Sequence, residues 1–122
     1  MILVDTSVWI DHLREADEKL IALLNSSRVV MHPFVIGELA CGNLQNRSRL
    51  LRLFQDLPKT RVATQDEALF FIERHGLMGK GIGFIDAHLL AATALHEGTR
   101  VWTRDKRLQA LARELNLAWP TT

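Results

Sequence analysis

Cysteine is nearly absent from this chain, and long hydrophobic runs are absent altogether. The only cysteine, Cys41, excludes an intramolecular disulfide and a cysteine-based zinc site. A single cysteine is also typical of a reducing compartment. The first residues lack the charged start and apolar run of a signal peptide. No stretch approaches the roughly 18 apolar residues that span a bilayer. We therefore expect a cytoplasmic protein that has no contact with a membrane.

Repeats, low-complexity segments and linkers rich in glycine, serine or proline are also missing. The chain has 122 residues, of which 48% are hydrophobic and 24% charged, so its composition is that of a folded globular protein. This length allows one hydrophobic core and is too short for two domains. The sequence therefore predicts a single domain over residues 1–122.

Short apolar runs alternate with helical patterns along the chain. The expected strands are residues 1–4, 29–31, 61–63, 100–103 and 117–119. The expected helices lie at about 8–13, 20–25, 33–42, 48–57, 64–75, 85–97 and 105–115. Thr64 and Glu67 form a capping-box pattern at one helix start, and Gly98 is placed as a helix stop. Strands that alternate with helices favour the α/β class, with a parallel sheet.

Motifs of several other catalytic sites do not occur. The five histidines show no H-E-x-x-H or similar metal-ligand spacing. The loop that contains Gly76, Gly79, Gly81 and Gly83 lacks the order of a phosphate-binding P-loop. The remaining candidates for chemistry are carboxylates.

Four carboxylates are placed where they can converge. Asp5 ends the first expected strand, and Asp105 closely follows the strand 100–103. In open α/β sheets, ligands collect beyond the carboxyl ends of the strands. Asp86 lies in the first turn of a helix entered from the glycine loop, so it can face the same edge. Glu38 lies within a helix, next to its apolar surface.

Such a cluster predicts a bound cation, because carboxylates crowded in one cleft repel each other strongly. Mg²⁺ prefers oxygen ligands and often uses only one or two carboxylates directly, and Mn²⁺ accepts the same ligands. A site of this kind suits phosphodiester hydrolysis. Since the net charge is +1, sequestering four carboxylates leaves +5 on the rest of the molecule, which suits nucleic acid. Charge alone favours an ordinary mixed surface.

Each acid also has an ordinary structural explanation when taken alone. Asp5 could be a turn residue, Asp86 and Asp105 could be helix caps or first-turn acids, and Glu38 could be a solvated helix residue. The hypothesis of a site therefore depends on the whole set and on its order along the chain.

Four segments resemble motifs of PIN domains and, more narrowly, of the VapC-type toxins of bacterial toxin–antitoxin pairs. They are residues 2–11, 33–42, 83–94 and 102–106. The resemblance implies a three-layer α/β/α PIN-like domain with a central, mainly parallel sheet. It also implies a divalent-metal-dependent endoribonuclease that uses Mg²⁺ or Mn²⁺ and cleaves RNA.

The same resemblance assigns roles by position. Asp5 and Asp86 would be the principal metal ligands. Glu38 and Asp105 would complete the cluster, in part through water. The hydroxyls of Thr103 and Thr6 would orient a ligand or a water molecule. The family further implies a homodimer and a cognate antitoxin that blocks the cleft, often with a basic side chain that can replace the metal as counter-charge.

Two alternatives from other functional classes stay open at this point. A phosphoacceptor signalling domain has this size and pattern, but it needs an acidic pair after the first strand, where Thr6 follows Asp5. It also needs an aspartate that ends a central strand, whereas Asp56 lies in a leucine-rich helical stretch. A PIN-like binding module without catalysis is the second alternative, and the intact acidic set argues against it.

Some basic and aromatic residues allow two interpretations. Arg104, Lys106 and Arg107 flank Asp105 and could contact phosphate or simply be solvated at a helix start. Trp9 is interpreted as a packing residue rather than a platform for base stacking.

Overall fold

A parallel sheet of three short strands forms the centre of the protein in the computed structural model, which describes residues 1–120. The strands are β1 (Ile2–Val4), β2 (Val29–Val30) and β3 (Arg100–Trp102), in the order β2-β1-β3. All strand residues except the half-buried Arg100 are buried. Burial of this extent is expected of a parallel sheet that helices cover on both faces.

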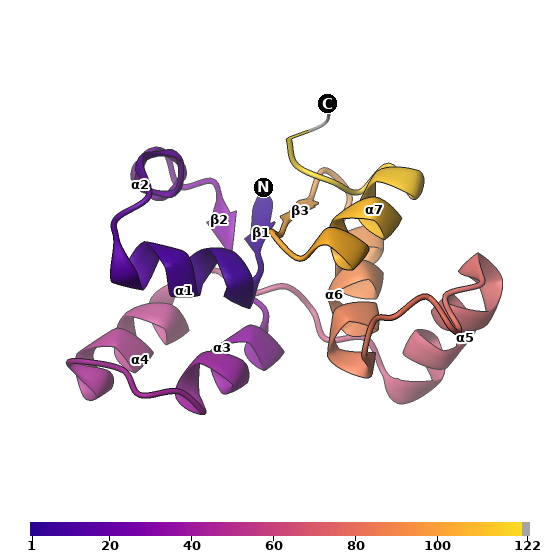
Figure 1. The fold of residues 1–122 in the computed structure, drawn as a ribbon, viewed down its shortest axis with the longest axis horizontal. Coiled ribbons are helices and arrows are strands. Elements are labelled where there is room, and N and C mark those ends of the chain that lie inside the picture. Colours follow the sequence, from indigo (N-terminus) through magenta and orange to yellow (C-terminus); the bar gives the residue numbers. More distant parts are fainter. Residues whose placement is uncertain (121–122) are drawn as a thin grey trace.

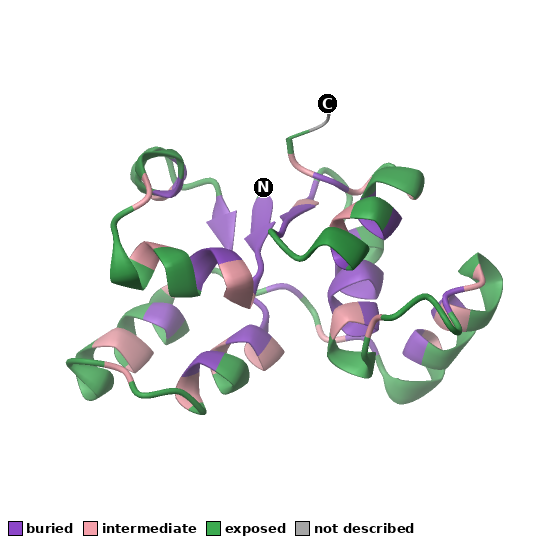
Figure 2. Cartoon of the chain, viewed as in Figure 1, coloured by how far each residue is buried: buried purple, intermediate pink, exposed green. Residues whose placement is uncertain are grey.

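Helices cover the sheet on two sides (Figure 1). One side carries α1 (Thr6–Arg14), α2 (Glu18–Asn25), α3 (Pro33–Ala40) and α4 (Arg47–Asp56). The other side carries α5 (Gln65–His75), α6 (Phe84–Leu95) and α7 (Lys106–Glu114). Their buried faces turn toward the strands (Figure 2). The expected α/β/α arrangement with a parallel sheet is therefore confirmed.

Two of the expected strands are wrong. Residues 61–63 form no strand, and Met31 instead makes a single parallel bridge with Lys59. Residues 117–119 contribute only one bridge, between Ala118 and Val101. Pro58 directly precedes Lys59. Because proline has no N–H, Pro58 cannot donate the hydrogen bond that would lengthen the first of these ladders along β2.

The predicted helix boundaries hold to within a few residues. The capping box is confirmed, since the Thr64 side chain accepts from the Glu67 N–H while the Glu67 carboxylate accepts from the Thr64 N–H. α1 begins earlier than expected, directly after Asp5, and α6 ends at Leu95, before the turn at Gly98. Within residues 1–120, no helix combines the length and the apolarity needed to cross a membrane.

Candidate catalytic site at the carboxyl edge of the sheet

Asp5 lies at the end of the central strand and is held by the neighbouring strand. Val4 is paired with Trp102, so the residues that follow them, Asp5 and Thr103, lie side by side. Both side chains are buried, and Asp5 is only 6% exposed. The Thr103 hydroxyl donates a 2.7 Å hydrogen bond to Asp5 Oδ2. The chain places β2 and β3 on opposite sides of β1, and such a switch in strand order is where open α/β sheets bind ligands.

Ser7 is a third member of this network. Its hydroxyl donates to Asp5 Oδ2 at 2.8 Å and accepts from the backbone N–H of Arg104 at 3.0 Å. Asp5 Oδ2 thus receives two hydroxyl donors, whereas Oδ1 accepts no hydrogen bond from any side chain that the structure describes. No role was assigned to Ser7 from the sequence. The available signal was a hydroxyl residue two positions after a strand-terminal aspartate.

Asp105 is oriented by the same network, and Glu38 is oriented by the neighbouring residue Thr6. The Asp105 N–H donates to Thr103 Oγ1 at 3.1 Å, and Asp105 Oδ1 caps α7 by accepting from the Leu108 N–H. Glu38 is exposed on α3, where its Oε1 accepts a 2.8 Å hydrogen bond from the Thr6 hydroxyl. Thr6 was expected to orient a ligand or water, and the structure places it against Glu38 itself.

The pKa of Asp86 responds to the charges of the other three acids. It lies half-buried in the first turn of α6. Burial, followed by the negative charges of Asp5, Asp105 and Glu38, raises the pKa of Asp86 to about 6. Asp86 is therefore within electrostatic range of all three other carboxylates.

None of the four acids forms an ion pair with a basic side chain of residues 1–120. The ion pairs formed by residues 1–120 involve other acids, namely Asp11, Asp17 and Glu67. In the same part of the chain, no three histidine, cysteine or acidic side chains are arranged so that they could hold one metal ion together. The donors are hard carboxylate oxygens, which suit Mg²⁺ or Mn²⁺ rather than a soft metal. Direct binding by two carboxylates, with the others acting through water, fits both observations.

The basic and aromatic residues named from the sequence now have defined surroundings. The Arg104 guanidinium pairs with Asp11 and Asp17 and is therefore not free for phosphate. Lys106 and Arg107 are exposed. Trp9 is buried against Phe54, with ring centroids 5.2 Å apart, which confirms it as a packing residue.

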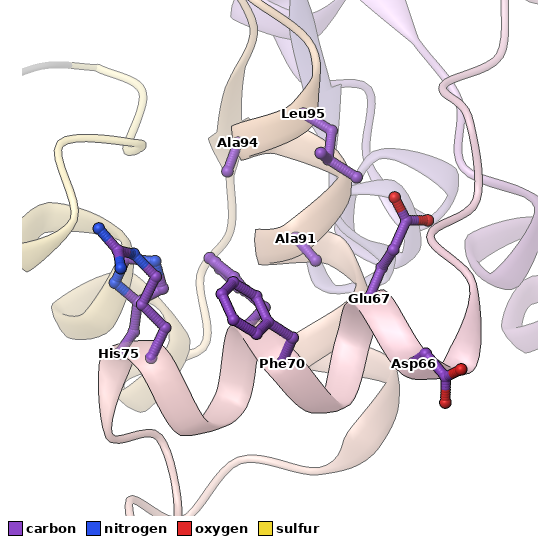
Figure 3. A pocket seen from close by; sticks show the side chains of 9 residues that line it. Asp66, Glu67, Phe70, His75, Ala91, Ala94 and Leu95 are labelled. Carbon is purple, nitrogen blue, oxygen red and sulfur yellow. The ribbon is translucent and has the colours of Figure 1, made fainter.

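Asp56 gives no support to the signalling alternative. It is exposed at the last residue of α4 and does not end a strand. A groove of about 410 Å³ lies between α5 and α6, and none of the four carboxylates lines it (Figure 3).

Comparison with known proteins places this geometry in context. Residues 2–114 match the family model described as PIN domain. The chain is 49% identical over 118 residues to Ribonuclease VapC32 of Mycobacterium tuberculosis, covering 97% of this chain and 95% of that protein. It is 30% identical over 131 residues to Ribonuclease VapC11 of the same organism, covering 96% of each. Among solved structures, FitAcB from Neisseria gonorrhoeae superposes with a TM-score of 0.64 at 23% identity, covering 97% of this chain and 95% of that chain. The matched region contains all four carboxylates.

Proposed function

The chain belongs to the PIN-domain family as a VapC-type ribonuclease, and from this premise we propose how it acts on RNA. It is the endoribonuclease toxin of a toxin–antitoxin pair, and it requires a divalent metal, as this family generally does. In our proposal, Asp5, Glu38, Asp86 and Asp105 together hold Mg²⁺ or Mn²⁺ against an RNA phosphate.

The uncompensated charge around Asp86 is the observation that supports this site. Burial, followed by the charges of three neighbouring carboxylates, raises the pKa of Asp86 to about 6. No lysine or arginine that the structure describes is paired with any of the four acids. A divalent cation removes this repulsion, and it supplies the charge that an RNA phosphate needs in order to approach.

The hydrogen bonds of Asp5 indicate how it can bind the metal. Asp5 Oδ1 is available to a metal because Ser7 and Thr103 occupy Oδ2. Asp5 and Asp86 are therefore the direct ligands in our proposal, while Glu38 and Asp105 bind through water. Such a metal, when bound, polarises the phosphate and makes its bound water a better nucleophile.

Two protein partners belong to the same proposal. A cognate antitoxin inhibits the enzyme by covering this cleft, and a basic side chain from it serves as counter-charge to the carboxylates. The enzyme itself acts as a homodimer.

Substitution of the two direct ligands tests the site. Purified wild type with RNA and Mn²⁺ should cleave. Asp5→Asn and Asp86→Asn should each cleave at least about 100-fold more slowly, since even outer-shell partners of a metal contribute about 10–100-fold. Asp56→Asn, on the exposed end of α4, is the matched control and should keep full activity.

The same assay separates the alternatives. Equal cleavage by the wild type and both site variants would mean that a contaminant is active or that the site is assigned wrongly. RNA binding by the wild type without cleavage in Mg²⁺ or Mn²⁺ would favour the inactive binding module.

A further inference from the structure

Arg107 is an exposed basic side chain that lies beside the proposed site. It follows Asp105 by two residues, in the first turn of α7. It forms no ion pair within the described chain, whereas Arg104 pairs with Asp11 and Asp17. Of these two arginines on either side of Asp105, one therefore holds the protein together and the other is available to a ligand.

The side chain of Arg107 packs against the loop of residues 76–83, which connects α5 to α6 (Figure 1). The contact is made at Gly81, whose φ is 83°. A Cβ atom at this position would lie 2.6 Å from Arg107 Nη1 and 2.7 Å from its Cδ. Because these separations are too short for any side chain, only glycine lets the arginine lie here. We call this close approach the Gly81 contact.

The Gly81 contact places Arg107 between two segments that carry acids of the proposed site. Arg107 belongs to the segment of Asp105, and Gly81 precedes Asp86 by five residues. Asp105 is in turn joined to Asp5 through the Thr103 hydroxyl, which accepts from the Asp105 N–H and donates to Asp5 Oδ2. The guanidinium is thus held at the carboxyl edge of the sheet, where RNA would approach the metal.

A free guanidinium at this edge has a chemistry that the acids lack. Its planar set of N–H donors matches two oxygens of one phosphate. A metal held by the acids serves the phosphate that is cleaved, but the acids repel the neighbouring phosphates of the same strand. A cation beside the cluster removes part of that repulsion, and its contact with the backbone fixes the position of the strand without reading the bases.

We propose that Arg107 binds an RNA phosphate next to the one that is cleaved, and that the Gly81 contact holds the guanidinium in position for it. The inference rests on the proposed function, because it takes RNA as the substrate at this edge. Binding of that phosphate requires neither the metal nor cleavage, so it can be measured separately from both.

Equilibrium binding of RNA tests the role of Arg107. The probe is a fluorescein-labelled single-stranded RNA, followed by fluorescence anisotropy in EDTA at several salt concentrations. Arg107→Ala should bind about tenfold more weakly than the wild type, since hydrogen bonds between charged groups are the strong ones. The slope of log K against log salt should fall by about 0.7, the value for one phosphate contact on a single strand.

Two further variants separate this contact from a general effect of charge. Arg107→Lys should keep the salt slope of the wild type, because the charge stays, and should lose part of the affinity with the planar donors. Arg113→Ala is the matched control, since Arg113 is also an exposed arginine of α7 without an ion pair in the described chain. It should bind RNA as the wild type does.

Two glycines of one loop test the Gly81 contact. Gly81→Ala should displace Arg107 and weaken RNA binding about as much as Arg107→Ala does. Gly79→Ala is the matched control, because Gly79 has a similar φ of 72° but a Cβ there would meet no described residue beyond its chain neighbours within 4 Å. It should bind like the wild type. Adding Gly81→Ala to Arg107→Ala should cause no further loss, and circular dichroism checks that each variant is folded.

The results that would overturn the inference are distinct. Equal binding by the wild type and Arg107→Ala, or an equal loss in Arg113→Ala, would rule out a phosphate contact at Arg107. A loss in Gly79→Ala as large as that in Gly81→Ala would assign the effect to loop strain and remove the role of the Gly81 contact. Cleavage in Mn²⁺ reports separately on the proposed function: RNA binding that depends on Arg107, without cleavage, would support this inference and reject the nuclease.

Discussion

Asp86 is the residue of the proposed site whose ionised form is disfavoured by its surroundings. Its pKa is raised from 3.8 to about 6, first by burial and then by the charges of Asp5, Asp105 and Glu38. A group whose pKa is higher in the folded than in the unfolded state binds protons more tightly when folded. Its stabilising contribution is therefore complete below about pH 4 and is lost as the pH rises through about 6.

Asp86→Asn should consequently stabilise the metal-free protein at neutral pH. A difference of about two pKa units corresponds to about 3 kcal/mol, and solvent screening of this half-buried group reduces the expected gain to about 1–2 kcal/mol. The gain should shrink toward zero as the pH falls to about 4, because the wild-type carboxyl is then protonated. Urea unfolding in EDTA at several pH values measures the difference.

Asp56→Asn is the control for this measurement, because Asp56 is an exposed acid at the last residue of α4 and is not among the charges that raise the pKa of Asp86. It should leave the pH dependence of the unfolding free energy as in the wild type. An Asp86→Asn variant that is less stable than the wild type at neutral pH would contradict the account of charge crowding.

At the residue scale, the places of Asp5 and Asp105 at the ends of strands could be predicted, and their hydrogen bonds could not. Asp5 and Asp105 follow strands, so their position at one edge of the sheet depends on local pattern and on a general property of α/β folds. The role of Ser7 depends on the backbone N–H of Arg104, 97 residues away in the sequence. No local pattern carries information about that contact.

The connection between β3 and α7 is the element that holds the site against α1. Within it, the Arg104 guanidinium pairs with Asp11 at the exposed side of α1 and with Asp17 at the start of α2. The same residue lies over the Trp102 ring, at 5.4 Å from its centroid, and its N–H donates to Ser7. Thr103 and its neighbours are thus fixed from both sides.

Arg104→Gln should loosen this connection without removing a group that touches RNA. Because the ion pairs are partly exposed, we expect a loss of about 0.5–2 kcal/mol in the free energy of unfolding. Cleavage should slow by about tenfold through kcat, since a small displacement of catalytic groups is enough for such an effect. Steady-state kinetics on an RNA substrate, with the KM and its salt dependence, measure the outcome.

Lys106→Gln is the matched control, because Lys106 is exposed beside the same connection and forms no ion pair within the described residues. A rise in KM with an unchanged kcat, together with a weaker salt dependence, would show that Arg104 contacts phosphate instead. The sequence allowed a phosphate contact for Arg104 because its ion-pair partners, Asp11 and Asp17, are distant from it along the chain.

At the scale of the whole molecule, the alternation of strands and helices was sufficient to predict the α/β class and a parallel sheet, while the three-layer arrangement was implied by the resemblance to PIN domains. The apolar runs that precede Asp5 and Thr103 are buried on both faces, which a continuous run of this kind indicates. The short pairings at Lys59 and Ala118 were harder to predict. Each depends on a partner strand distant in the sequence, and a pairing of this kind leaves no periodic signal in the chain.

In the proposed site, the four acids belong to the sheet edge and to helices that pack around it, so metal binding should stabilise the entire fold. A cation that binds only the native state adds about 1.4 kcal/mol at ten times its Kd, which corresponds to a rise of a few degrees in Tm for a chain of this size. Differential scanning calorimetry with increasing Mg²⁺ or Mn²⁺, reversed by EDTA, measures this shift.

Comparing the metal-induced change in Tm between Asp86→Asn and a control variant tests whether the cation binds at the four acids. Asp86→Asn should be more stable than the wild type in EDTA and yet gain much less from metal, because one substitution removes both the repulsion and a ligand. Asp56→Asn should gain as much from metal as the wild type does. If millimolar metal leaves the wild-type Tm unchanged, or raises the Tm of Asp86→Asn equally, the crowded carboxylates are not the place where the cation binds.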